Sequence, residues 1–146
     1  MIKVTTFCVQ QTEELGAKIA AVLKGNEMIA LSGDLGAGKT AFTRGLCAGL
    51  GIHDGVCSPT FAIVNTYRGK YPVFHFDMYR IKDADDLFAT GYYDYIGNGV
   101  IIIEWCDNIA SELEPDRIGI TIRKTDNENE RIFEMEGLDE YASVIC

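Results

Sequence analysis

A run of glycines with a lysine and a threonine occupies residues 33–40, with the sequence Gly-Asp-Leu-Gly-Ala-Gly-Lys-Thr. It fits the pattern G-x-x-x-x-G-K-[ST] at every fixed position. Glycines allow successive backbone N–H groups to turn toward one centre, so such a loop forms a concave nest for phosphate oxygens at the positive end of the next helix. In this pattern Lys39 meets the β- and γ-phosphates and the Thr40 hydroxyl binds Mg²⁺. The run predicts a site for a nucleoside triphosphate and Mg²⁺.

The nucleotide is expected to contact this loop and the first turn of the helix after it. The predicted contacts are Asp34, Leu35, Gly36, Ala37, Gly38, Lys39, Thr40 and Ala41. Many such loops carry a second hydroxyl residue where this chain has Ala41. Only the backbone N–H of Ala41 is therefore expected to meet the α-phosphate.

Two carboxylates, Asp77 and Glu104, close β-rich runs and are the candidate catalytic residues. Ligands collect beyond the carboxyl ends of strands in open α/β sheets, where the phosphate loop also lies. Glu104 follows four apolar residues, the form of the acidic metal partner in P-loop nucleotidases, and is predicted to complete Mg²⁺ coordination with Thr40. A merely solvated Glu104 remains an alternative, as does an Asp77 that forms a structural ion pair near Arg80.

Further polar and aromatic residues are candidates for a switch or a partner contact. The segment 58–61, Ser-Pro-Thr-Phe, ends the loop after the phosphate-binding helix, where related nucleotidases carry a switch that reaches the γ-phosphate. A simple turn before a strand uses the same residue types. Trp105 directly follows Glu104, so its side chain is expected to face away from the glutamate, as core or as a partner anchor. The candidate switch and partner residues are Ser58, Thr60, Tyr79, Arg80 and Trp105.

The elements that hold these residues alternate between strand and helix patterns. Strands are predicted at 28–31, 61–67, 71–77, 100–104, 117–123 and 131–136, and the helix after the loop at 40–50. Short links within the pairs 61–77 and 117–136 indicate two antiparallel hairpins. The run at 100–104 is continuously apolar up to its closing carboxylate, Glu104, as a central strand buried on both faces would be. The sequence predicts an α/β, P-loop nucleotidase-like three-layer fold with a mixed parallel and antiparallel sheet.

Composition limits the possible partners and compartments. The 146 residues are 47% apolar and 24% charged, which suits one domain over residues 1–146. The net charge is −9, with 22 acidic and 13 basic residues. Tight binding to a phosphate backbone depends on Lys and Arg, so direct, tight binding of nucleic acid is not expected.

Cysteine and histidine usage gives no metal signal. The five cysteines include no C-x-x-C pair, and His53 and His75 lack ligand spacing. Unpaired cysteines favour a reduced compartment, and neither a secretory leader nor a membrane-spanning run is visible. We therefore expect a cytoplasmic protein with no membrane contact.

The ensemble of motifs resembles the TsaE family. The residues are Gly-Asp-Leu-Gly-Ala-Gly-Lys-Thr at 33–40, Ser-Pro-Thr-Phe at 58–61, His-Phe-Asp-Met-Tyr-Arg at 75–80 and Ile-Glu-Trp at 103–105. The resemblance covers residues 12–122 and implies an ATPase of low intrinsic activity that works with the proteins TsaB and TsaD. Its role would be formation of N6-threonylcarbamoyladenosine at position 37 of tRNAs that read ANN codons.

The same resemblance implies roles for individual residues. Thr40 and Glu104 would hold Mg²⁺, Asp77 would lie near the γ-phosphate, and 58–61 would be the switch. A small-molecule kinase with the same loop is the main alternative, although no segment combines spare length with the clustered arginines of a kinase lid. A module that binds ATP without turnover is a third possibility.

Overall fold

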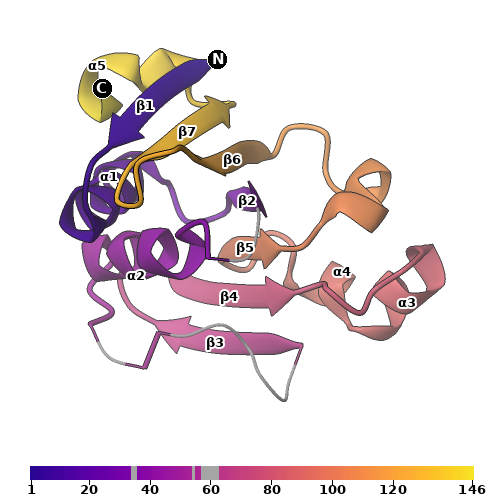
Figure 1. The fold of residues 1–146 in the computed structure, drawn as a ribbon. Coiled ribbons are helices and arrows are strands. Elements are labelled where there is room, and N and C mark those ends of the chain that lie inside the picture. Colours follow the sequence, from indigo (N-terminus) through magenta and orange to yellow (C-terminus); the bar gives the residue numbers. More distant parts are fainter. Residues whose placement is uncertain (34–35, 54, 57–62) are drawn as a thin grey trace.

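Seven strands form one sheet in the order β1-β7-β6-β2-β5-β4-β3 (Figure 1). The structure is a computed structural model that describes residues 1–33, 36–53, 55–56 and 63–146. The strands are β1 (Ile2–Thr6), β2 (Met28–Gly33), β3 (Val64–Arg68), β4 (Pro72–Asp77), β5 (Val100–Glu104), β6 (Ile118–Lys124) and β7 (Arg131–Glu136).

The sheet is mixed, as the sequence predicts. Strands β4, β5, β2 and β6 form the centre of the sheet and run parallel to one another. The hairpins β3–β4 and β6–β7 are antiparallel, and β1 pairs antiparallel with β7 at one edge. In the pairing of β4 with β5, Asp77 stands opposite Glu104. Both predicted catalytic carboxylates therefore lie side by side at the carboxyl ends of the parallel strands.

Helices cover the two faces and complete three layers (Figure 1). The helical segments are α1 (Val9–Val22), α2 (Lys39–Gly49), α3 (Ala84–Ala89), α4 (Tyr92–Tyr95), η1 (Asp107–Glu112), η2 (Asp139–Tyr141) and α5 (Ala142–Ile145). One core packs α1, α2 and α5 against the sheet, and a second packs α3, α4 and η1 against the opposite face. The predicted three-layer architecture is confirmed.

Strand β5 shows why its first four residues are apolar. All five of its residues are buried. Side chains alternate along a strand, so Val100 and Ile102 enter the core of α1 and α2, whereas Ile101 and Ile103 enter the other core. Glu104 follows Ile102 in this alternation and so lies on the α2 face, where the loop residues are.

Two further features of the described residues are the state of their cysteines and the length of their helices. Cys8, Cys47, Cys106 and Cys146 are free thiols. Burial raises the pKa of the Cys47 thiol to about 12 and also raises the pKa of Cys106, so both stay protonated at neutral pH. Within the described ranges, no helix is long and apolar enough to cross a membrane.

Candidate functional site

The loop after β2 leads directly into α2. Gly38 caps the helix in a left-handed conformation with φ of 108°, and Gly36 has φ of 76°. Residues with a Cβ atom strongly disfavour these positive φ angles, which explains why glycine occupies these two positions of the pattern. The first turn of a helix has backbone N–H groups without intrahelical partners. The N-terminus of α2 therefore offers donors and positive potential for an anion.

An open cavity of about 360 Å³ lies where β4 and β5 end and α2 begins. It is lined by Gly36, Gly38, Lys39, Thr40, Asp77, Glu104 and Trp105. The cavity is thus formed by the glycine-rich loop, the start of α2, the ends of β4 and β5, and the tryptophan that follows β5. The structure brings these predicted residues together, and their roles remain predictions.

Lys39 places a buried ammonium at this cavity. The residue is only 7% exposed. Its Nζ donates a hydrogen bond to the Gly33 carbonyl at 2.7 Å and lies 3.6 Å from the centroid of the Trp105 ring. A carbonyl and a π-face both favour a cation, and together they stabilise the ammonium group at the cavity.

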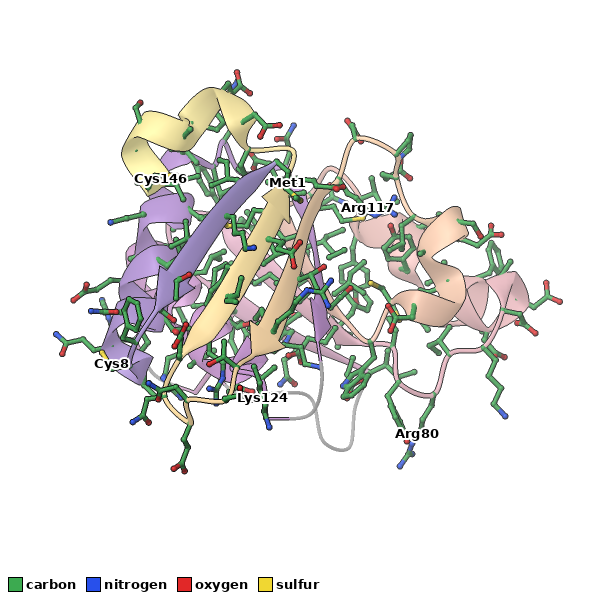
Figure 2. The ribbon with its side chains drawn as sticks, turned by 45° about the horizontal axis from the view of Figure 1, so that its top comes forward. Met1, Cys8, Arg80, Arg117, Lys124 and Cys146 are labelled. Atoms are coloured by element: carbon green, nitrogen blue, oxygen red, sulfur yellow. The ribbon has the colours of Figure 1, made fainter. Side chains whose placement is uncertain are left out.

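Trp105 corrects one expectation. Its side chain does not face away from the site of Glu104, because both residues line the cavity. Strand β5 ends at Glu104 and Trp105 has φ of 60°, so the alternation of a strand does not extend to it. The ring also meets Tyr79 edge-on, with centroids 5.4 Å apart. Tyr79 is exposed beside the cavity, and Arg80 points outward from the fold (Figure 2).

The two carboxylates have different surroundings. Glu104 is 2% exposed, and its Oε2 lies 3.0 Å from Nε2 of the buried His75. Asp77 is half-buried, and its Oδ1 accepts a hydrogen bond from the Tyr79 N–H at 2.9 Å. No ion pair joins Asp77 to Arg80, both of which the structure describes, so the turn hydrogen bond is what positions the Asp77 carboxylate.

The donor chemistry of the cavity fits Mg²⁺. Thr40, Asp77 and Glu104 all offer oxygen atoms, the ligands that Mg²⁺ prefers. Among the described residues, no group of three or more His, Cys, Asp or Glu side chains is placed to hold a metal ion alone. This arrangement suits an ion that one or two protein oxygens share with nucleotide phosphates.

The β6–β7 hairpin supplies residues that the sequence did not reveal. Nε of Arg131 donates to the Ala37 carbonyl at 3.0 Å, and Nη2 lies 3.5 Å from the Gly36 carbonyl. A Cβ atom at Gly36 would come within 3.2 Å of Nζ of Lys124. Arg131 is 94 positions from Ala37 in the chain, so local patterns carry no signal for this contact. The hairpin thus buttresses the loop.

Some predicted site residues lie outside the described residues: Asp34, Leu35, Ser58 and Thr60, with the rest of 57–62. Their nucleotide and switch roles stay predictions. Ala41 lies half-buried in the first turn of α2, in line with its predicted place beside the loop.

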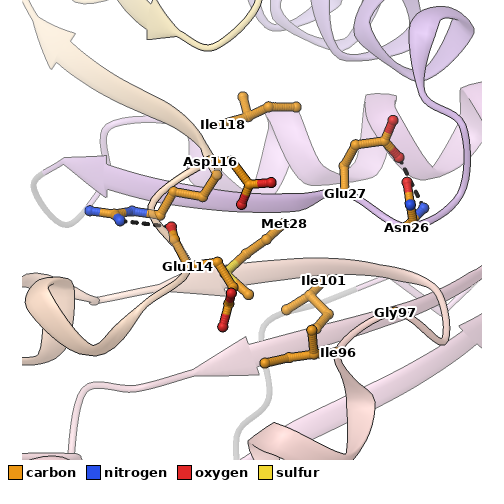
Figure 3. A pocket seen from close by; sticks show the side chains of 10 residues that line it. Asn26, Glu27, Met28, Ile96, Gly97, Ile101, Glu114, Asp116 and Ile118 are labelled. Carbon is orange, nitrogen blue, oxygen red and sulfur yellow. Dashed lines mark hydrogen bonds between the residues drawn. The ribbon is translucent and has the colours of Figure 1, made fainter.

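A second cavity, of about 300 Å³, opens at the amino ends of the parallel strands, where β2 and β5 begin (Figure 3). Its acidic residues include Glu27, Glu114 and Asp116. The Glu27 carboxylate accepts hydrogen bonds from the N–H groups of Lys24, Gly25 and Asn26 at 2.7 to 3.1 Å. Glu27 thus stabilises a turn, and none of the predicted site residues lies in this cavity.

Binding of ATP is expected to change the fluorescence of Trp105, the only tryptophan in the chain. The reason is that Lys39 lies over the indole ring and would turn toward the phosphates. The measurement is an ATP titration of tryptophan emission. Lys39→Met, which keeps most of the length of the side chain but not the charge, should shift the starting emission and lose the response. Unchanged emission at an ATP concentration that calorimetry shows to be saturating would contradict this geometry.

Comparison with known proteins identifies relatives over most of the chain. A family model described as threonylcarbamoyl adenosine biosynthesis protein TsaE matches residues 7–133. A tRNA threonylcarbamoyladenosine biosynthesis protein TsaE from Bacillus subtilis (strain 168) is 39% identical over 139 residues, which are 93% of this chain and 87% of that protein. The protein of the same name from Treponema pallidum (strain Nichols) is 36% identical over 124 residues, or 84% of this chain and 92% of that protein.

A solved structure shows the same architecture. The crystal structure of YdiB from Bacillus subtilis superposes with a TM-score of 0.77 at 32% sequence identity. The match covers 98% of this chain and 90% of that chain. The residues matched by the family model include the loop, both strand-end carboxylates and the tryptophan that meet at the cavity. The sequence and structure matches to relatives cover most of the chain. The chain therefore belongs to the TsaE family of tRNA threonylcarbamoyladenosine biosynthesis proteins.

Proposed function

We propose that this protein is a Mg²⁺-dependent ATPase of the cytoplasm that acts with TsaB and TsaD. The modification served would be the threonylcarbamoyl group on adenosine 37 of ANN-decoding tRNAs. The observation that carries the proposal is the single cavity that gathers Lys39, Thr40, Asp77 and Glu104 at the N-terminus of α2. Family membership supplies the tRNA-modification context.

The residues around the cavity can divide the work of phosphoryl transfer to water. Lys39 and the first N–H groups of α2 bind the phosphate chain and stabilise its negative charge. Thr40 and Glu104 offer the oxygens for Mg²⁺, which would neutralise charge on the β- and γ-phosphates when bound. Asp77, which pairs with Glu104 in the register of β4 and β5, would orient a water molecule toward the γ-phosphate.

Association with the partners is expected to depend on the nucleotide. ATP would order the switch at 58–61 and hydrolysis would release it, so the two states would present different surfaces. Tyr79, 66% exposed and in contact with Trp105, offers an aromatic anchor beside the cavity. Binding to the TsaB–TsaD pair should be measured in ATP and in ADP, with Tyr79→Ala as a variant outside the phosphate site. Equal partner affinity in both nucleotides would contradict the switch.

The same experiment can include tRNA. With a net charge of −9, the isolated protein can neutralise few phosphates, so tight binding to tRNA at physiological salt is not expected. Direct tRNA binding with nanomolar affinity would overturn this expectation and assign the protein a role on the RNA itself.

A further inference from the structure

His75 lies directly behind Glu104 on the α2 face of the sheet. It stands on β4 two residues before Asp77, and the Asp77–Glu104 pairing brings the two strands into parallel register at this point. The His75 side chain is fully buried, and its Nε2 lies 3.0 Å from Oε2 of Glu104. The imidazole therefore contacts the carboxylate from inside the protein, while Glu104 lines the cavity on its other side.

The direction of this hydrogen bond follows from the chemistry of the two groups. A carboxylate that binds Mg²⁺ is ionised and only accepts hydrogen bonds, so beside such a carboxylate Nε2 carries the proton and donates it. The other ring nitrogen, Nδ1, is buried and has no hydrogen-bond partner among the described residues. A position that needed only packing would be filled better by an apolar residue such as its neighbours on this face, Val73 and Ile102. Among the residues that the structure describes, Glu104 is the one hydrogen-bond partner of the imidazole.

We propose that His75 is a positioning residue for the metal site, an inference that rests on the function proposed above. Its Nε2–H fixes Oε2 of Glu104, so the carboxylate is held in one orientation and presents its oxygens to Mg²⁺ without having to be ordered on binding. Partners of this kind, hydrogen-bonded to a ligating carboxylate, commonly set metal affinity. His75 itself is too deep to touch the nucleotide.

The test compares two amide substitutions that differ in reach. In His75→Gln the amide nitrogen can occupy the place of Nε2 and still donate to Glu104. In His75→Asn the amide reaches only the place of Nδ1, so the donor to Glu104 is lost. Both substitutions bury the same chemical group, which makes them a matched pair. His75→Leu is a second variant without a donor and suits the apolar surroundings should the asparagine protein fold poorly.

The readout is the affinity of the ADP-bound protein for Mn²⁺, used as a paramagnetic probe for the Mg²⁺ site and measured by electron paramagnetic resonance. His75→Asn and His75→Leu should weaken Mn²⁺ binding by about 10- to 100-fold. His75→Gln should stay near wild type. The affinity for ADP in EDTA should be the same in all variants, because the phosphate loop is untouched.

Equal Mn²⁺ affinities of the asparagine, leucine and glutamine proteins, whether normal or reduced, would overturn the inference, because a donor at Nε2 would then make no difference. Glu104→Gln, measured alongside, distinguishes this failure from failure of the proposed function. If Glu104→Gln binds Mn²⁺ as wild type does, Glu104 is not a metal ligand, and the metal site and the role of His75 are both wrong.

Discussion

Lys39→Ala is expected to abolish tight binding of ATP while the protein stays folded. The Nζ group lies at the cavity, held by the Gly33 carbonyl and the Trp105 ring, and Lys39 belongs to neither apolar core. Hydrogen bonds to charged groups contribute about 1.5–3 kcal/mol each, so the loss of two such bonds to phosphate predicts about 10²–10⁴-fold weaker binding. Isothermal titration calorimetry with ATP measures the effect directly.

Lys70→Ala is the matched control. Lys70 is exposed in the turn between β3 and β4, at the opposite end of β4 from Asp77, with Nζ 5.4 Å from the Tyr71 ring centroid. Its removal deletes the same charge at a distance from the cavity and should leave ATP affinity unchanged. A folded Lys39→Ala protein with wild-type affinity for ATP would refute the phosphate-binding role of the loop.

Glu104→Ala is expected to separate nucleotide binding from hydrolysis. The loop and the N-terminus of α2 remain, so ATP should still bind in EDTA, but the strengthening by Mg²⁺ should disappear. Metal ions stabilise the transition state by several kcal/mol, so hydrolysis should fall by at least about 100-fold. ATP affinity with and without Mg²⁺, together with phosphate release, measures the two effects separately.

The structure adds a caution to the design of this variant. Alanine leaves the Nε2–H of buried His75 without its acceptor, which costs about 1–3 kcal/mol of stability. Glu104→Gln keeps an acceptor oxygen for His75 and a similar volume, so it removes the charge with less effect on the fold. If both variants hydrolyse ATP normally, the acidic partner of the metal lies elsewhere, and Asp77→Asn is the next substitution to test.

Local patterns predicted the elements that surround the site. The apolar run that ends in Glu104 was sufficient to predict β5, and the short links were sufficient to predict the hairpins β3–β4 and β6–β7. These elements are predictable because each is determined by residues that are close together in the sequence. Asp77 and Glu104 are expected to lie close together because the carboxyl ends of neighbouring parallel strands lie side by side, and the register confirms it.

The sequence could not predict contacts that depend on distant segments or on unusual backbone angles. Arg131 reaches the loop from a hairpin 94 positions away. Trp105 turns into the cavity because its φ of 60° breaks the strand alternation. His75 lacks the spacing of a metal ligand, and its position behind Glu104 becomes visible only when β4 and β5 are placed side by side.

The central claim is tested most directly by phosphate release from ATP in the presence of Mg²⁺, with and without the TsaB–TsaD pair. We predict slow release by the protein alone, faster release with the pair, and loss of both rates in Lys39→Ala and in EDTA. Mass spectrometry of the nucleotides and of added small-molecule acceptors shows where the phosphoryl group goes. No release above the partner-only background, or transfer of the phosphoryl group to a small molecule instead of water, would contradict the account.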